Sequence, residues 1–167
     1  CSPAQLVERL AIAKAADVVR RVTQSESGPI DWSRRAADQV VVLAADTVAE
    51  CDGQILGKPA DADDARRMLR LLSSRKHRVL SGVCLWPLAG GSNTSYLSRI
   101  AETVLRMDTL TDDQLDDYLA SGQWQGKAGA FGYQDRLGWV HVIDGSESNV
   151  VGLPMELVVE MIHAVGY

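Results

Sequence analysis

The 167-residue sequence has few cysteines, no long apolar run and no excess of positive charge. Its three cysteines include no C-x-x-C pair, which argues against a disulfide framework or a zinc site and fits a reducing, cytoplasmic setting. No apolar run approaches the length of a membrane-spanning helix, so we expect no membrane association. With 17 Lys and Arg residues against 22 Asp and Glu, the net charge of −5 argues against binding to nucleic-acid polymers.

The overall composition is that of an ordinary globular domain. Apolar residues make up 46% of the chain and charged residues 23%, values that are typical of globular proteins and not of disordered chains or coiled coils. The length predicts one domain over residues 1–167.

The hydrophobic pattern predicts alternating helices and strands. Val40 to Ala45 is a continuous, β-branched apolar run, which is typical of a strand buried on both faces, and Asp46 follows at its expected carboxyl end. Further strands are predicted at 79–86, 100–107 and 139–143, and helices after Ser2, Asp61 and Thr111 and over 155–164. The interleaving predicts the α/β class, with a mixed central sheet flanked by helices.

The first predicted helix carries an apolar stripe with a lysine inside it. Its expected buried residues are Leu6, Leu10, Val18 and Val22, and Lys14 lies four residues from two of them. A lysine in such a stripe either packs its stem while its amine reaches water or serves a site.

Four charged residues are candidates for chemistry. A carboxylate after an apolar strand, such as Asp46, lies either in a ligand site at the sheet edge or in a cap. Lys58 lies between Gly57 and Pro59, and Lys127 lies in a glycine-rich segment, 126–132, whose backbone can approach a phosphate. The alternative is a plain surface turn for Lys58 and a flexible turn for Lys127. Together with Lys14, the set suits a metal-assisted reaction on a phosphorylated substrate.

Several common catalytic motifs are missing from the sequence. It contains no Walker loop, no G-x-G-x-x-G fingerprint and no G-x-S-x-G elbow. His77 lies in the basic run R-K-H-R at 75–78, which we interpret as a solvated connection between a helix and a strand.

Five sequence blocks occur in a fixed order and together resemble one known family. They are L-A-I-A-K-A at 10–15, A-D-T-V at 45–48 with G-Q-I-L-G-K-P at 53–59, A-R-R-M-L-R-L-L-S at 65–73 with H-R-V-L-S-G at 77–82, K-A-G-A-F-G-Y-Q at 127–134, and G-S at 145–146 with N-V-V-G-L-P at 149–154. In this order they resemble the Maf family of nucleoside triphosphate pyrophosphatases, from about residue 3 to the end.

The resemblance implies an activity and roles for six residues. The family cleaves nucleoside triphosphates to a monophosphate and pyrophosphate with Mg²⁺ or Mn²⁺. By resemblance, Asp46 is the proton acceptor and a metal ligand, and Lys14, Lys58 and Lys127 face the triphosphate. Thr47 and Gln134 resemble the dTTP/UTP-type members rather than those that prefer 7-methyl-GTP.

The same resemblance implies an architecture and a setting. It predicts an elongated, inosine-triphosphatase-like fold with the nucleotide in a central cleft, often a homodimer, in the cytoplasm.

The chain also departs from the family pattern. The family's first strand and its S-x-S-P-R-R loop have no counterpart, and we expect them to lie upstream of Cys1. Gly126 stands where the family has an aspartate before the lysine. Two functions therefore stay open: an active pyrophosphatase, or an inactive fragment or degenerate homologue that only binds nucleotides or serves a structural role.

Overall fold

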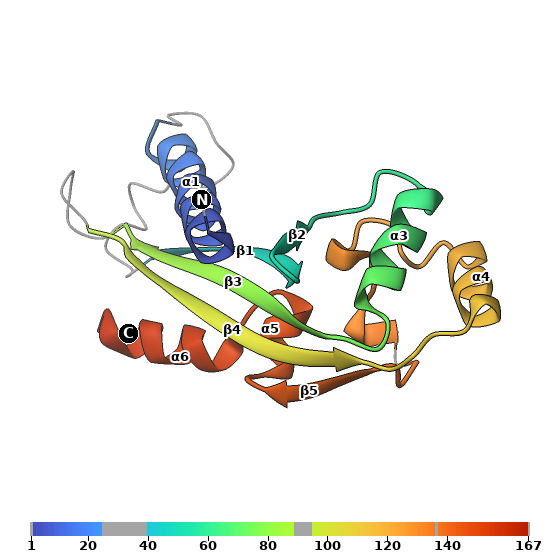
Figure 1. Ribbon diagram of the computed structural model, residues 1–167. Helices are drawn as coiled ribbons and strands as arrows, with labels where there is room; N and C mark the ends of the chain where they lie inside the picture. Colours follow the sequence, from blue (N-terminus) through green and yellow to red (C-terminus); the bar gives the residue numbers. More distant parts are fainter. Residues whose placement is uncertain (1, 25–39, 89–94, 136, 167) are drawn as a thin grey trace.

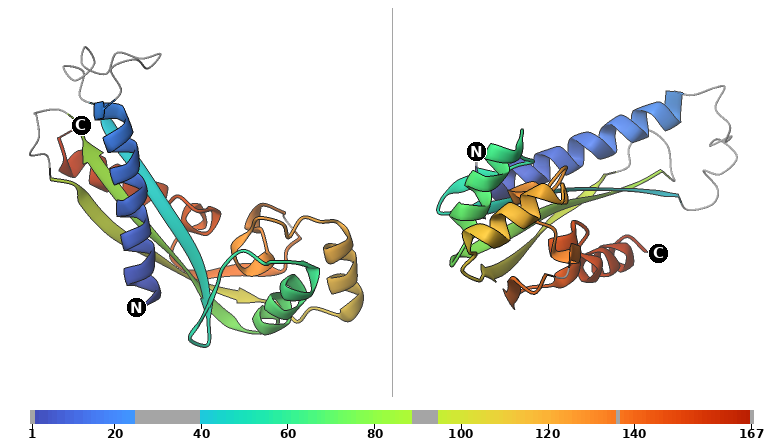
Figure 2. Two further views of the ribbon diagram at one scale, coloured as in Figure 1. Left: turned by 90° about the horizontal axis from the view of Figure 1, so that it is seen from above. Right: turned by 90° about the vertical axis from the view of Figure 1, so that its right-hand side faces the viewer.

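A five-stranded sheet runs through the middle of the structure, with helices on both of its faces. The computed structural model describes residues 2–24, 40–88, 95–135 and 137–166. In this part the strand order is β2-β1-β3-β4-β5. Figures 1 and 2 show an elongated molecule in which α1 covers one face of the sheet, α5 and α6 cover the other, and α3 and α4 lie at one end.

The elements have the following bounds. The strands are β1 (Val41–Cys51), β2 (Gln54–Leu56), β3 (Lys76–Pro87), β4 (Leu97–Met107) and β5 (Val140–Asp144). The α-helices are α1 (Pro3–Gln24), α3 (Ala62–Leu72), α4 (Asp112–Ala120), α5 (Glu147–Val151) and α6 (Met155–Ala164). Two short 3₁₀ helices, η1 (Ala128–Ala130) and η2 (Tyr133–Asp135), lie between α4 and β5.

The α/β class with a central sheet flanked by helices is confirmed, but the expected mixture of strand directions is not found. Every strand pair in the described residues is antiparallel. The tight turn at Asp52 and Gly53, with φ values of 49° and 80°, joins β1 directly to β2. Parallel neighbours would need a long crossover, whereas such a turn joins antiparallel strands.

Strand β1 is longer and less buried than predicted. It pairs with β3 without a break from Val41 to Glu50, so Asp46 lies in the middle of the strand and not at its end. The apolar half is also not buried on both faces, since the Leu43 side chain is 42% exposed. The continuous apolar run identified a strand but did not reveal its continuation through polar residues, because those residues pair through their backbones.

The buried face of α1 differs from the predicted stripe. Val7, Ala11 and Ala15 are fully buried, whereas Leu10 and Val18 are 39% and 43% exposed. The helix approaches the sheet so closely that a Cβ at Gly82 would lie 2.4 Å from the Val7 carbonyl oxygen. Such close contact requires small residues at the interface, so the alanines and not the larger residues face the sheet.

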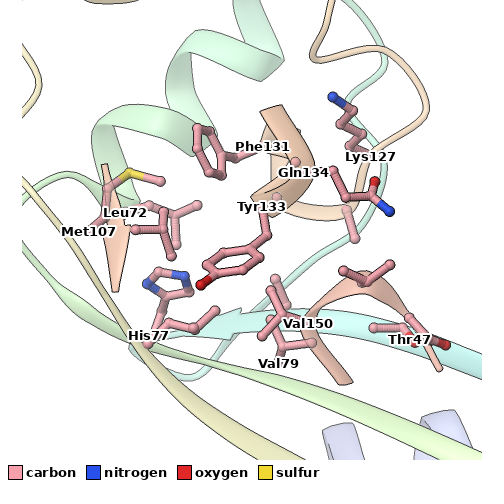
Figure 3. Close-up of a pocket in the computed structure, with 18 of the residues that line it drawn as sticks. Thr47, Leu72, His77, Val79, Met107, Lys127, Phe131, Tyr133, Gln134 and Val150 are labelled. Atoms are coloured by element: carbon pink, nitrogen blue, oxygen red, sulfur yellow. Dashed lines mark hydrogen bonds between the residues drawn. The ribbon is translucent and has the colours of Figure 1, made fainter. Parts of the chain in front are cut away.

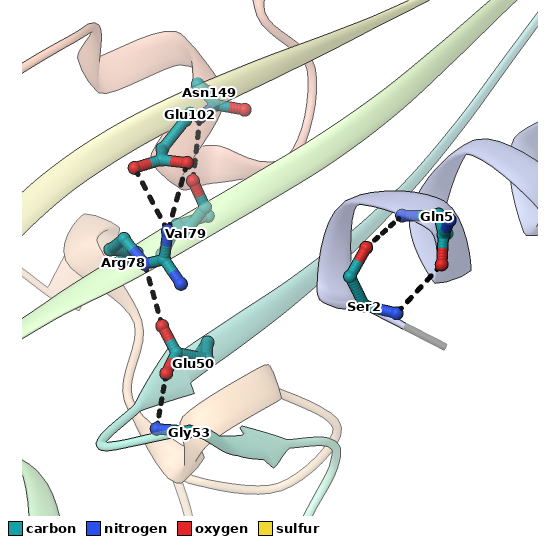
Figure 4. Close-up of polar contacts among 8 residues, drawn as sticks. All are labelled: Ser2, Gln5, Glu50, Gly53, Arg78, Val79, Glu102 and Asn149. Atoms are coloured by element: carbon teal, nitrogen blue, oxygen red, sulfur yellow. Dashed lines mark hydrogen bonds and ion pairs between the residues drawn. The ribbon is translucent and has the colours of Figure 1, made fainter.

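Local capping agrees with the sequence. Asp61 accepts a hydrogen bond from the Asp64 amide at 2.8 Å, and Thr111 forms a capping box with Gln114. At the start of α1, Ser2 Oγ accepts from the Gln5 amide at 3.2 Å (Figure 4). Helix α6 begins and ends at the predicted residues. No helix in the described ranges is both long enough and apolar enough to cross a membrane.

Helix α5 is attached to the sheet by one buried asparagine. The Asn149 amide donates to the Val79 carbonyl at 3.2 Å (Figure 4). It also donates to Thr103 Oγ1 at 2.9 Å. This places the turn that follows α5, including Gly152, over the middle of β1 and β3.

Candidate active site

A cavity of about 280 Å³ lies between the sheet, the end of α3, the η1–η2 segment and the turn after α5. Its apolar wall includes Ala49, Leu72, Val79, Leu105, Met107, Phe131, Tyr133, Val140 and Val150. Four predicted site residues also line it: Thr47, Lys58, Lys127 and Gln134. In Figure 3, His77 and Met107 lie at one end of the cavity, and Thr47 and Gln134 lie at the other.

Thr47 is held in place at the cavity wall by two neighbours. Its Oγ1 lies 2.7 Å from Ser81 Oγ on β3 and donates to the Gly152 carbonyl at 3.3 Å. The side chain therefore joins β1, β3 and the turn after α5, and its orientation is fixed.

Lys58 and Gln134 lie at the exposed rim. Lys58 lies two residues after the end of β2, between Gly57 and Pro59. The Gly57 carbonyl accepts from the Gly129 amide at 3.0 Å, so the loop that carries Lys58 is tied to the glycine-rich segment. Gln134 lies in η2 with an exposed side chain. Both side chains are free to meet a ligand that enters from solvent.

Lys127 is partly buried and contacts an aspartate that sequence reasoning missed. Its Nζ lies 2.5 Å and 2.7 Å from the two carboxylate oxygens of Asp135. The Tyr118 hydroxyl donates to the same carboxylate at 2.7 Å. An eight-residue separation across two irregular turns has no periodicity, so the sequence offered no signal for this pair beyond a carboxylate near a glycine-rich segment.

The structure contradicts the interpretation of His77 as part of a solvated connection. His77 lies in β3, is only 6% exposed, and its Nδ1 has no hydrogen-bond partner among the residues that the structure describes. Burial lowers the pKa of His77 from its usual 6.5, against the opposing effect of the Arg75 backbone. The basic neighbours hid a position whose side chain points inward because strand residues alternate between faces.

Lys14 and Asp46 form a pair that is separate from the cavity. Lys14 contacts the Asp46 carboxylate and donates to the Ala45 carbonyl at 3.1 Å. Val48, which follows Asp46 by two residues and shares its face of β1, packs against α1, whereas Thr47 and Ala49 line the cavity. Asp46 and Thr47 therefore point to opposite faces of β1.

The edge of the sheet lies close to both groups. In the described residues β2 pairs with β1 only from Ala49 to Cys51, so the Val41–Val48 part of β1 has β3 on one side and no strand on the other. A ligand that lies across this edge can contact Asp46 on one face and Thr47 on the other.

The residues that the structure describes can supply a partial metal site. Within the described ranges, no group of three or more His, Cys, Asp or Glu side chains could hold a metal ion. Proteins commonly hold Mg²⁺ with one or two carboxylates, the remaining positions being filled by substrate phosphates and water. Asp46, with 18% of its side chain exposed, fits the role of such a single protein ligand.

Comparison with known proteins places the chain in a family. Residues 1–165 match the family of Maf-like proteins. The chain belongs to the Maf-like protein family. The antiparallel sheet flanked by helices is consistent with a Maf-like fold.

Two relatives of this Maf-like chain carry the same name. This chain is 50% identical over 159 residues to the dTTP/UTP pyrophosphatase of Rhodopirellula baltica, and the match covers 95% of this chain and 62% of that protein. It is 40% identical over 162 residues to the dTTP/UTP pyrophosphatase of Aromatoleum aromaticum, covering 96% of this chain and 71% of that protein. The chain thus spans less than two thirds of the length of the Rhodopirellula relative.

Proposed function

We propose that this Maf-like chain is a nucleoside triphosphate pyrophosphatase, a hydrolase that converts dTTP or UTP to the monophosphate and pyrophosphate. The proposal rests on one observation above all: Thr47 and Lys58 from one stretch of the sequence, and Lys127 and Gln134 from another far along the chain, line the same cavity. The relatives named dTTP/UTP pyrophosphatase support the substrate class.

The cavity suits a nucleobase. Phe131 and Tyr133 give it flat aromatic surfaces, and aliphatic side chains form most of the remaining wall. Ligand pockets are mostly apolar, with a few placed polar groups that determine specificity. Gln134 at the rim offers one donor and one acceptor to a pyrimidine edge.

The lysines suit the triphosphate. Lys58 and Lys127 both border the cavity, and their positive charges stabilise the negative charge that builds on phosphate oxygens during transfer. From the cavity, the phosphates would extend across the open edge of β1 toward Asp46 and Lys14.

At that edge Asp46 would act as the general base. Asp46 takes a proton from a water molecule, and the water oxygen attacks the α-phosphorus. The bond between the α-phosphorus and the α,β-bridging oxygen then breaks, and pyrophosphate leaves with that oxygen. A divalent ion, Mg²⁺ or Mn²⁺, would be held by Asp46 together with phosphate oxygens and would supply positive charge to them when bound.

A second candidate function is nucleotide binding without turnover. The observation in its favour is that Asp46 is paired with Lys14 and points to the face opposite the cavity wall. In this case the cavity would hold the base and the lysines the phosphates, with no group in place to activate water.

One experiment separates the two functions. Pyrophosphate release is measured from dTTP, UTP, CTP and 7-methyl-GTP, with Mg²⁺ and with Mn²⁺, beside calorimetric binding of a UTP analogue whose α,β-bridging oxygen is replaced by a methylene group. Hydrolysis of dTTP and UTP above the other two substrates supports the pyrophosphatase. Analogue binding without hydrolysis under either metal supports the binding protein instead.

A further inference from the structure

The ion pair between Lys127 and Asp135 is built into the site and is not a flexible surface contact. The side chains are 27% and 11% exposed, and both Asp135 oxygens lie within 2.7 Å of Lys127 Nζ. A Cβ at Gly132 would lie 2.6 Å from Lys127 Nζ and 2.9 Å from Asp135 Oδ2. The backbone at position 132 therefore passes close to the pair, and a Cβ added there would displace one of the two side chains.

Asp135 is held in turn by Tyr118. The Tyr118 hydroxyl donates to Asp135 Oδ2 at 2.7 Å, and its ring packs against Phe131 and Trp139 with centroid distances of 5.7 and 5.8 Å. Burial, together with Asp135, raises the pKa of Tyr118, so the hydroxyl keeps its proton and remains a donor. The carboxylate thus has a fixed orientation before any ligand arrives.

The geometry leaves part of the lysine free. An ammonium group carries three N–H donors, and the two Asp135 oxygens engage at most two of them. Lys127 also lines the cavity, so the remaining donor is available to a ligand there. The residue before Lys127 is Gly126, which offers no carboxylate of its own, so Asp135 is the acidic partner of this lysine.

We infer that Asp135 is a positioning residue for Lys127: it fixes the ammonium so that its free N–H meets a phosphate oxygen of the nucleotide. This inference rests on the proposed function, because it assumes a nucleotide in the cavity. A flexible lysine would lose side-chain entropy on meeting the phosphate, whereas a lysine that is already held loses little. Asp135 acts through Lys127 and does not itself touch the substrate.

A double-mutant cycle tests the inference. Asp135→Asn is made alone and in a Lys127→Ala background, with Asp113→Asn, an exposed aspartate in the first turn of α4, as the matched control. Each protein is assayed for kcat and KM with UTP and for affinity toward the methylene analogue. We expect Asp135→Asn alone to lower kcat/KM and analogue affinity by about ten-fold or more, and Asp113→Asn to change neither.

The decisive comparison is the effect of Asp135→Asn in the Lys127→Ala background. If Asp135 acts through Lys127, Asp135→Asn changes activity and affinity there by less than about two-fold. An equal loss in both backgrounds overturns the inference, because it means that Asp135 acts on folding or on the substrate directly. Near-normal affinity in the single Asp135→Asn variant also overturns it.

Two further measurements keep the test decisive. If Asp135→Asn does not fold, Tyr118→Phe keeps the ring packing and removes only the hydroxyl bond to Asp135. It should lower affinity several-fold, and this loss should also vanish in the Lys127→Ala background; an additive loss overturns the inference. If the unmodified protein binds the analogue but hydrolyses no nucleotide, the proposed function fails while the affinity cycle still decides the role of Asp135.

Discussion

The Lys14 ammonium contacts the Asp46 carboxylate across the interface between α1 and β1, and it donates a further hydrogen bond to the Ala45 carbonyl at 3.1 Å. The pair joins the first helix to the strand that carries both Asp46 and Thr47. Because the Lys14 side chain is exposed, a phosphate that reaches this edge meets an ammonium already aligned with the carboxylate. The orientation of Asp46 is therefore set by α1.

Asp46→Asn should abolish most turnover without unfolding the protein. The change is nearly isosteric, but an amide accepts no proton from water, so kcat for dTTP and UTP should fall by about 10² or more. Asp63→Asn, an exposed aspartate in α3, is the matched control and should keep normal kcat. Steady-state kinetics and a thermal melt check the prediction, and turnover close to normal in Asp46→Asn contradicts the role of Asp46.

Gln134→Glu should weaken the use of pyrimidine nucleotides. Gln134 is exposed at the cavity rim, so the new charge costs little stability, but it removes the amide donor that would face a base oxygen. One lost pocket contact is worth about 1–3 kcal/mol, and kcat/KM for dTTP and UTP should fall by about ten-fold.

The same acidic substitution at Thr47 is a harsher change. Thr47 Oγ1 lies 2.7 Å from Ser81 Oγ, and a glutamate there would also disrupt this contact. Thr47→Ser, which keeps the hydroxyl, is the appropriate control and should retain dTTP and UTP activity. A preference of the unmodified protein for 7-methyl-GTP would contradict both specificity assignments.

Local signals in the sequence were sufficient for α1, α3, α4 and α6 and for most strands, but the short helix α5 was not predicted. The caps at Asp61 and Thr111 and the full span of α6 follow from residues close together in the chain. The buried face of α1 could not be predicted from nearby residues, because it depends on how near the backbone of β3 comes to the helix at Gly82. Apolar size alone favours Leu10 over Ala11, and only the tertiary contact reverses that order.

The candidate site was predicted in part. Sequence blocks identified Thr47, Lys58, Lys127 and Gln134, which the structure brings to one cavity. Their roles and those of Lys14 and Asp46 stay predictions, as do the metal and a homodimer. Asp135 and His77 were missed because their environments come from the fold: the first meets Lys127 only after two turns, and the second is buried although its neighbours are basic.

Gly82→Ala should destabilise the protein by loosening α1. The added Cβ would lie 2.4 Å from the Val7 carbonyl oxygen, and backbone atoms cannot yield as a flexible side chain can. Overpacking of this kind costs about 1–3 kcal/mol, measurable as a lower urea midpoint. Gly57→Ala is the matched control, since an added Cβ there meets nothing within 4 Å and should leave the midpoint unchanged. Equal midpoints for both variants would contradict the close approach of α1 to β3.

His77 should make the protein less stable at mildly acidic pH. Burial lowers the pKa of His77 below 6.5, so between the folded and unfolded pKa values the unfolded chain binds more protons. The contribution of His77 to the free energy of unfolding is therefore constant above about pH 6.5 and falls as the pH drops below it, by at most ~1.4 kcal/mol per pH unit. Urea unfolding at intervals from about pH 7.5 to 5 measures this slope.

His77→Phe identifies the residue responsible. The phenyl ring keeps the packing in the cavity wall but does not titrate, so the decline between about pH 6.5 and 5 should become shallower. His163→Gln is the matched control: His163 is exposed in the last turn of α6, and its removal should leave the decline unchanged. If the unmodified protein and His77→Phe lose stability in parallel over this range, His77 is not the titrating group. Such a result would also mean that solvent reaches the imidazole, contrary to its burial beneath Tyr133 and Met107 at the end of the cavity (Figure 3).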